Sequence, residues 1–179
     1  MQAVAVFCGS KPGNHPLYLQ HAKQLGKALA QAQKTLVYGG GNKGLMGAVA
    51  TAALDAGGKV VGIIPERLRS FEHQHEGLTE LVVVPDMHTR KRLMYERCDA
   101  AVILAGGYGT MDELFEMLTW NQLEIHDKPV YMLNTAGFYT DLFQMMQVMH
   151  KEGFLYSPLE KRVRIYDVPD VLMEHLLKP

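Results

Sequence analysis

The chain has few cysteines, no excess of either charge and no long hydrophobic run. The spacing of its two cysteines, Cys8 and Cys98, fits neither a disulfide framework nor a metal site. Lys and Arg number 18 against 19 for Asp and Glu, so the charge balance indicates neither nucleic acid nor an anionic membrane as a partner. The apolar run Ala3–Phe7 is too short for a signal peptide, and no stretch is long enough to cross a membrane. These absences favour a reduced, cytoplasmic protein.

What the chain does have is a regular alternation of short apolar runs with helical patterns. We predict strands at Ala3–Phe7, Thr35–Tyr38, Lys59–Ile64, Leu81–Val84, Ala100–Leu104, Val130–Leu133 and Val163–Tyr166. We predict helices at Pro16–Ala32, Leu45–Ala56, Met87–Arg97, Met111–Leu123, Tyr139–Lys151 and Val168–Leu177. Unbroken apolar strands followed by helices predict an α/β fold, namely a three-layer, Rossmann-like, doubly wound and mainly parallel sheet with helices on both faces. Residues 1–179 show neither a linker nor a repeat, so we expect a single nucleotide-binding domain.

The most informative segment is the glycine loop Ala105–Glu113, which directly follows a predicted strand. Its glycines Gly106, Gly107 and Gly109 allow backbone N–H groups to turn toward a ligand where a Cβ atom would collide. The next helix, which we expect Thr110 to open, adds free N–H donors and the positive end of a dipole. Together these features predict a cradle for an anion, most plausibly a phosphate.

The acids of this loop allow two interpretations. Asp112 and Glu113 would bind phosphate poorly, which indicates that they serve another purpose. Thr110 and Glu113 also match a capping box, in which each side chain satisfies a backbone donor at the start of the helix. The two interpretations can both hold, because a capping glutamate can still face a ligand.

Two further glycine turns follow predicted strands, at Cys8–Ser10 and Gly39–Gly47. Since ligands of such sheets sit at the carboxyl ends of strands, the three turns predict one nucleotide-sized site. The second turn matches the pattern Gly-x-Gly-x-x-Gly, which would indicate a dinucleotide cofactor. However, it follows the second strand and lacks the acid expected at the tip of the next one. A tight turn with close helix–sheet packing is the alternative.

A basic cluster, Arg90, Lys91 and Arg92, falls in the first two turns of a predicted helix that Asp86 would cap. Cations near a helix N-terminus oppose the helix dipole, so the cluster indicates either an anion-binding site or a solvated charged face. The run 72–76 contains two histidines and could coordinate a metal, but its spacing supports a solvated loop better.

Taken together, these segments resemble the Lonely Guy (LOG) family of cytokinin riboside 5'-monophosphate phosphoribohydrolases. The resemblance covers nearly the whole chain and rests on motifs at residues 7–10, 38–47, 87–91, 106–113, 119–120 and 126–129. Its most specific part pairs Arg90-Lys91 with the downstream Gly-Gly-x-Gly-Thr-x-x-Glu. One departure is Ala105, where the family usually has proline.

The resemblance implies a catalytic pair, Arg90 and Glu113. It implies substrate contacts from Glu72, Arg90, Lys91, Gly106, Gly107, Tyr108, Gly109, Thr110, Met111, Asp112 and Thr119. It also implies a homodimer with the site near the interface, and no cofactor or metal. We expect no nucleic acid or membrane partner.

The implied reaction is hydrolysis of the N-glycosidic bond of a nucleoside 5'-monophosphate, giving a free base and ribose 5-phosphate. Broader activity on AMP or another monophosphate stays open, because the motifs constrain the phosphoribosyl end and leave the base end undefined. A non-catalytic carrier of a nucleotide or of the molybdenum cofactor is the alternative of another class. Lysine decarboxylation, a label that some relatives carry, would need a pyridoxal-type Schiff base, and we find no sign of that arrangement.

Overall fold

The computed structural model describes residues 1–69, 71 and 73–178. Within that part of the chain, seven strands form one sheet: β1 (Ala3–Phe7), β2 (Thr35–Tyr38), β3 (Val60–Pro65), β4 (Glu80–Val84), β5 (Ala100–Ile103), β6 (Val130–Leu133) and β7 (Val163–Tyr166). The helices are α1 (Pro16–Gln31), α2 (Gly44–Asp55), α3 (Met87–Glu96), α4 (Tyr108–Gln122), α5 (Thr140–Lys151) and α6 (Pro169–Leu177). Short 3-10 turns occur at η1 (Glu66–Leu68), η2 (Thr135–Gly137) and η3 (Leu159–Lys161).

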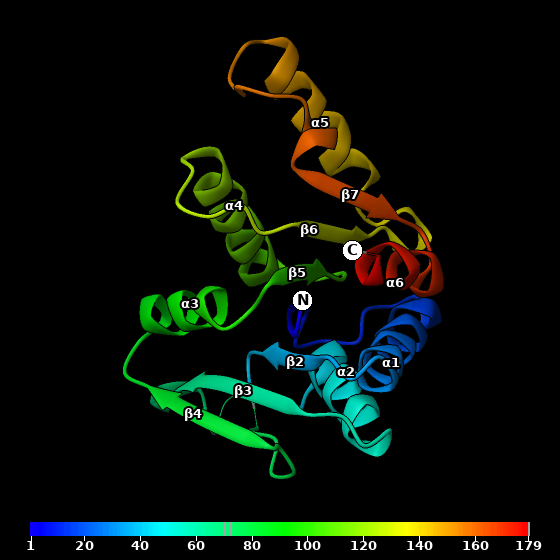
Figure 1. Cartoon of the computed structure of the whole chain (residues 1–179), viewed down its shortest axis with the longest axis vertical. Coiled ribbons are helices and arrows are strands. Elements are labelled where there is room, and N and C mark those ends of the chain that lie inside the picture. Colours follow the sequence, from blue (N-terminus) through cyan, green and yellow to red (C-terminus); the bar gives the residue numbers. More distant parts are fainter. Residues whose placement is uncertain (70, 72, 179) are drawn as a thin grey trace.

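The strands follow the order β4-β3-β2-β1-β5-β6-β7, and every neighbouring pair is parallel. The chain therefore builds outward from β1 to β4, crosses back, and builds outward again from β5 to β7 (Figure 1). This arrangement confirms the predicted doubly wound, Rossmann-like fold. It creates a switch point between β1 and β5, where ligands of such folds bind at the carboxyl ends of the strands.

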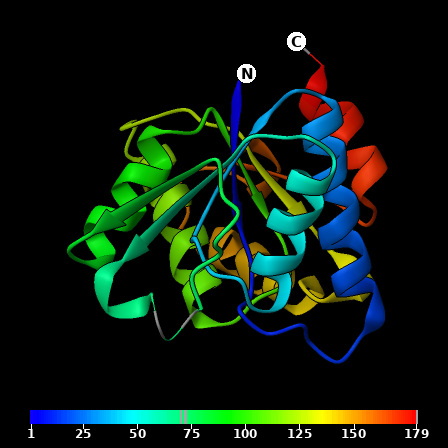
Figure 2. The same ribbon diagram turned by 90° about the horizontal axis from the view of Figure 1, so that it is seen from below.

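Helices cover both faces of the sheet, which explains why its central strands are apolar without alternation. On one face, α1, α2 and α6 pack against one buried cluster of apolar side chains. On the other face, α3, α4 and α5 pack against a second cluster. Figure 2 shows the two helical layers on opposite sides of the sheet. The central strands β1, β3, β5 and β6 are buried along nearly their whole length, as parallel strands between two layers require.

One predicted boundary that matters for the site is wrong. Helix α4 begins at Tyr108, and its N-cap is Gly107 rather than Thr110. Thr110 lies inside the first turn, where its side chain packs over Gly106. The capping-box interpretation of Thr110 and Glu113 is therefore wrong, because Gly107 and not Thr110 holds the N-cap position. The helix starts earlier than predicted because glycine is also a favourable N-cap residue, although it offers no side-chain hydrogen bond.

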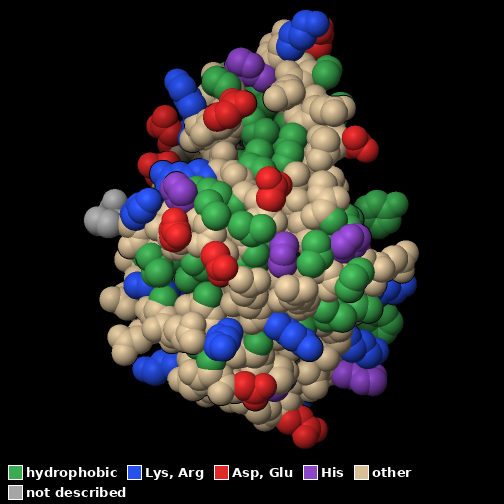
Figure 3. All heavy atoms as spheres, turned by 90° about the vertical axis from the view of Figure 1, so that its right-hand side faces the viewer, with side chains coloured by type: hydrophobic (Ala, Val, Ile, Leu, Met, Phe, Trp, Pro, Cys, Tyr) green, Lys and Arg blue, Asp and Glu red, His purple; other side chains and the backbone are tan. Residues whose placement is uncertain are grey.

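The surface shows no large field of one sign on the side drawn in Figure 3, where Lys, Arg, Asp, Glu and His are interspersed. This pattern agrees with the near-zero net charge of the chain. In the part of the chain that the structure describes, no helix is long and apolar enough to span a membrane.

Candidate active site

A pocket of about 570 Å³ opens at the switch point between β1 and β5. Its walls come from segments far apart in the sequence: residues 6–13, Tyr18, Gly39, Leu45, Met46, Leu68, Met87, Arg90, Met94, residues 105–110, Glu113 and Phe138. The volume falls within the usual range for a small-molecule site. The glycine turns after β1, β2 and β5 all contribute, so the prediction that they converge on one site is confirmed.

Backbone hydrogen bonds tie the three turns together. The N–H of Gly9, after β1, donates to the carbonyl of Ala105, after β5, at 3.0 Å. The N–H of Leu45, at the start of α2, donates to the carbonyl of Gly9 at 3.1 Å. The floor of the pocket is therefore held by main-chain contacts between elements that the sheet brings together.

The glycines of the loop before α4 serve two different needs. A Cβ atom on Gly106 would lie 2.1 Å from Oγ1 of Thr110 and 2.9 Å from the nitrogen of Gly9, so packing requires glycine there. A Cβ atom on Gly107 or Gly109 would meet no protein atom within 4 Å. Space therefore remains beside these two residues, next to the free N–H groups of the first turn of α4. This geometry is what a phosphate cradle needs.

Arg90 is a buried cation that reaches the pocket from α3. Arg90 is only 4% exposed, and its Nη2 donates to the carbonyl of Gly39 at 3.1 Å. A Cβ atom on Gly39 would lie 1.9 Å from that same Nη2, so the guanidinium can occupy this place only because residue 39 is glycine. The solvated-face interpretation is therefore wrong for Arg90. The close contact also supports the packing interpretation of the Gly39–Gly47 turn.

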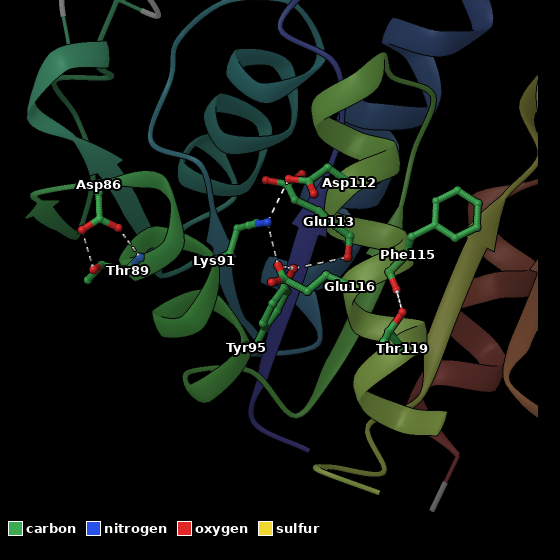
Figure 4. Close-up of polar contacts among 9 residues, drawn as sticks. All are labelled: Asp86, Thr89, Lys91, Tyr95, Asp112, Glu113, Phe115, Glu116 and Thr119. Carbon is green, nitrogen blue, oxygen red and sulfur yellow. Dashed lines mark hydrogen bonds and ion pairs between the residues drawn. The ribbon is translucent and has the colours of Figure 1, made fainter. Parts of the chain in front are cut away.

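Glu113 lines the same pocket from α4 and is 8% exposed. Its neighbour Asp112 is exposed and points toward Lys91 on α3 (Figure 4). The structure thus brings Arg90 and Glu113, the predicted catalytic pair, into one buried site from two helices. Buried charged groups of opposite sign in one pocket are typical of a functional site.

Lys91 has a different environment from Arg90, although the two residues are adjacent. Its Nζ lies 2.9 Å from Oδ2 of Asp112 and 2.9 Å from Oε2 of Glu116, so it joins α3 to α4 (Figure 4). The hydroxyl of Tyr95 donates to Oε2 of Glu116 at 2.8 Å. Burial lowers the pKa of Lys91, but the hydrogen bonds and charges of Glu116 and Asp112 outweigh this, and the pKa lies above its usual value. Burial, followed by the hydrogen bond and charge of Glu116, raises the pKa of Tyr95.

The remaining predicted site residues divide into three groups. Tyr108 and Thr110 line the pocket, Tyr108 being 96% exposed at its mouth. Lys91, Met111, Asp112 and Thr119 are not among the described residues that line the pocket. Thr119 is exposed on α4, where its Oγ1 donates to the carbonyl of Phe115 at 2.7 Å (Figure 4). Glu72 lies outside the described residues.

The pocket also includes residues that sequence reasoning did not single out. Met46, Met87, Met94 and Phe138 line it, although they belong to two helices, α2 and α3, and to the turn after β6. Methionines at helical spacing predict only core packing, so the sequence contains no signal that would separate these from the other methionines. Lys11, after β1, adds an exposed cation that its strand-end position could have indicated.

The metal alternative gains no support from side-chain placement. Among the described residues, no three or more His, Cys, Asp or Glu side chains lie together as a metal site would require. His75, in the loop that prompted this alternative, instead has its Nε2 3.1 Å from Oγ1 of Thr51. It also accepts a hydrogen bond from the N–H of Gly77 at 3.1 Å.

Comparison with known proteins gives a consistent set of relatives. A family model described as "Possible lysine decarboxylase" matches residues 46–176. A cytokinin riboside 5'-monophosphate phosphoribohydrolase of Rhodococcoides fascians is 48% identical over 163 residues, which cover 90% of this chain and 82% of that protein. The Arabidopsis thaliana cytokinin riboside 5'-monophosphate phosphoribohydrolase LOG7 is 45% identical over 160 residues, covering 89% of this chain and 73% of the relative.

Solved structures with the same fold include proteins of another class. The molybdenum cofactor carrier protein of Chlamydomonas reinhardtii matches with a TM-score of 0.73 and 20% identity, covering 98% of this chain and 95% of that one. The molybdenum cofactor binding protein of Rippkaea orientalis matches with a TM-score of 0.73 and 24% identity, covering 98% and 94%. At such identities the similarity shows the fold alone.

Proposed function

The chain belongs to the Lonely Guy (LOG) family of phosphoribohydrolases, and on that premise we propose that it hydrolyses the N-glycosidic bond of an N6-substituted adenosine 5'-monophosphate. The products are the free base and ribose 5-phosphate. The observation that carries this proposal is that Arg90 and Glu113, both buried, line one pocket together with the glycine cradle.

Glu113 is the group proposed to act on the sugar. Positive charge builds on the sugar as the bond from its anomeric carbon to the base nitrogen breaks, as it does in glycoside hydrolysis. A buried carboxylate stabilises this charge and accepts a proton from the attacking water, whose oxygen forms the new bond to that carbon. The base leaves with the electron pair of the broken bond and takes up a proton.

The glycine cradle and Arg90 are proposed to hold the nucleotide in place. The N–H groups at the start of α4, beside Gly107 and Gly109, suit a phosphate that carries about −1.5 to −2 charge at pH 7. Anchoring the phosphate positions the distant anomeric carbon relative to Glu113, and such positioning lowers the barrier. Arg90 adds a fixed positive charge whose orientation is supported by its hydrogen bond to the carbonyl of Gly39.

The substrate contacts expected of Glu72, Lys91, Met111, Asp112 and Thr119 remain predictions. The ammonium of Lys91 already has two carboxylate partners, so its contribution to binding would come through the placement of α4 beside α3. Asp112 and Thr119 are exposed on the outer face of α4 and would reach a substrate only where that face meets another surface.

We propose that this surface belongs to a second copy of the chain. The exposed face of α4 carries Tyr108, Asp112, Phe115 and Thr119 at helical spacing, and the exposed Leu123 follows at its end. A homodimer across this face would cover the apolar side chains and place Asp112 and Thr119 at the interface.

The oligomeric state in solution tests this arrangement. Light scattering of the wild-type protein should give twice the chain mass. Phe115→Glu should give monomers, whereas Phe154→Glu, at another exposed site, should not. A monomeric wild-type protein would refute this arrangement.

Two other functions have weaker support. A carrier of a nucleotide or of the molybdenum cofactor needs no buried carboxylate beside its phosphate site, and Glu113 provides one. A lysine decarboxylase needs a lysine that can lose its proton to form a Schiff base. The buried Lys91 does not suit this chemistry, because its two carboxylate partners raise its pKa.

We further propose that residues 1–179 act as one nucleotide-binding domain, since β1 to β7 build one sheet. A cytoplasmic location is supported by Cys98, which is buried and not part of a disulfide. Burial raises the pKa of the Cys98 thiol to about 11, which makes it unreactive at neutral pH.

The decisive experiment is product analysis by chromatography after incubation with AMP and with N6-isopentenyl-AMP. We expect a free base and ribose 5-phosphate from both, with the ratio of rates reporting whether the enzyme prefers the substituted base or acts broadly on monophosphates. Glu113→Gln is the matched control, because it keeps the size of the side chain and removes its charge. It should bind nucleotide and lose turnover by about 10²-fold or more.

Two results would overturn the proposal. Full activity of Glu113→Gln would show that this carboxylate is not the catalytic group. Nucleotide binding without release of base from either substrate would favour a carrier.

A further inference from the structure

A second pocket, of about 390 Å³, lies at the end of the sheet opposite to the candidate active site. It is formed where β6 and β7 begin and where α4 ends, whereas the first pocket lies where β1 and β5 end. Figure 1 shows α4 running toward the loop that leads into β6. The charged residues that line this pocket are Lys128, Lys161, Arg162 and Arg164, with Asp127 and Glu160.

Four cations and only two acids line this pocket, which leaves an excess of positive charge. Among the described residues, none of its four cations forms an ion pair with a carboxylate. Arg162 donates instead to neutral acceptors, from Nη1 to the carbonyl of Asn121 at 3.2 Å and from Nε to Oγ of Ser157 at 3.2 Å. Lys128 likewise donates from Nζ to the carbonyl of Tyr95. The pocket therefore presents excess positive charge, which attracts an anion.

Asn121 supplies a second and independent sign of a ligand. It lines the pocket from the last turn of α4 and is only 4% exposed. Its Nδ2 donates to the carbonyl of Lys128 at 2.9 Å, which fixes the orientation of the amide. Its Oδ1 is buried and has no hydrogen-bond partner among the described residues. A buried acceptor of this kind needs a donor from outside the protein chain.

We propose that this pocket binds inorganic phosphate or a phosphate monoester. The cations would hold the anionic oxygens, and Oδ1 of Asn121 would accept a hydrogen bond from an O–H of the ligand. A protonated phosphate carries such an O–H group, as does the sugar of a sugar phosphate. Sulfate has the same shape and charge as phosphate but carries no O–H at neutral pH. The orphan acceptor therefore predicts discrimination between two otherwise similar anions.

Two structural explanations compete with this proposal. The guanidinium of Arg162 could serve only to satisfy the C-terminal carbonyls of α4, where a cation also interacts well with the helix dipole. A buried water could satisfy Oδ1 of Asn121. Both explanations predict that no anion binds the pocket in a saturable way.

The test is a titration of the ¹⁵N-labelled full chain followed by NMR, with inorganic phosphate, ribose 5-phosphate and sulfate at matched ionic strength. Backbone amides of Asp127, Lys128, Val130 and residues 160–164 report on this pocket. Asn121 and Glu113 are eight residues apart on α4, or about 12 Å along its axis, so binding at the candidate active site is followed separately by the amides of residues 107–113. The outcome does not depend on the proposed enzymatic function.

The matched variants are Lys161→Glu in the pocket and Lys23→Glu on the exposed side of α1. Both lysines are exposed, so both variants should fold. We expect saturable shifts with at least one phosphate, about fivefold weaker binding of sulfate, and a loss of about tenfold in Lys161→Glu but less than twofold in Lys23→Glu. Whichever of inorganic phosphate and ribose 5-phosphate binds more tightly then shows whether the pocket takes free phosphate or a phosphate monoester. Absence of saturable shifts, equal binding of sulfate, or an unchanged affinity in Lys161→Glu would each overturn the proposal.

Discussion

Replacing Lys91 by methionine tests whether the cation between α3 and α4 holds the active-site helix in place. The variant keeps the apolar stem of the side chain and removes the ammonium. In the wild-type protein this ammonium is 2.9 Å from a carboxylate oxygen of Asp112 and 2.9 Å from one of Glu116. The side chain of Lys91 is 9% exposed, whereas those of Asp112 and Glu116 are 57% and 25% exposed.

These exposures set the size of the expected effect. The pair with the exposed Asp112 contributes at most about 1 kcal/mol, because solvent screens it. The hydrogen bond to the more buried Glu116 contributes about 1.5–3 kcal/mol, as is usual for bonds to charged groups. We therefore expect Lys91→Met to lower the free energy of unfolding by about 2–3 kcal/mol. For a chain of this size, the loss corresponds to roughly 5–10 °C in Tm.

The pH dependence of this loss has a defined sign. The pKa of Lys91 in the folded protein lies above the ordinary lysine value of 10.5. Because the folded pKa is raised, the stabilisation is fully present below the unfolded pKa and disappears as the pH rises through the folded pKa. The difference between wild type and Lys91→Met should therefore be constant near neutral pH and shrink above about pH 10.5.

Urea denaturation across this pH range measures both quantities. Arg92→Met is the control, since Arg92 neighbours Lys91 but is 61% exposed, with a 3.8 Å contact to Glu96. It should change the free energy of unfolding by less than about 0.5 kcal/mol. A loss below about 1 kcal/mol in Lys91→Met, or a loss that does not shrink at high pH, would refute the reasoning.

Three further predictions concern two glycines and a buried hydroxyl. Gly26→Ala should destabilise the protein by about 1–3 kcal/mol, because the new Cβ atom would lie 2.2 Å from the carbonyl of Val49 on α2. In Gly109→Ala the new Cβ atom meets no protein atom within 4 Å, so thermal unfolding should show no loss of stability. An increase in KM of this variant would indicate that the methyl group occupies space needed by the phosphate. Tyr139→Phe removes a 2.6 Å hydrogen bond to the carbonyl of Leu104, directly after β5, and should lower the free energy of unfolding by about 1–2 kcal/mol. Unchanged urea midpoints for Gly26→Ala or Tyr139→Phe would contradict these expectations.

The sequence by itself determined the secondary structure and the fold class. The predicted strands and helices match the observed ones within about three residues at each end, and four of the seven strands match fully. Both patterns are local: unbroken apolar runs predict buried parallel strands, and glycines at strand ends predict turns. The motifs that hold Arg90 and Glu113 were also visible, because residue type and spacing are properties of the chain.

Only the tertiary structure decided how these residues are used. Arg90 and Lys91 are adjacent, but about 100° of helical rotation separates their side chains, so one enters the pocket while the other joins α4. The sheet order placed β1 beside β5 and so brought Gly9 against Ala105. Likewise, packing required glycine at position 106 but left open space at Gly107. These outcomes depend on contacts between segments far apart in the chain, which no local pattern encodes.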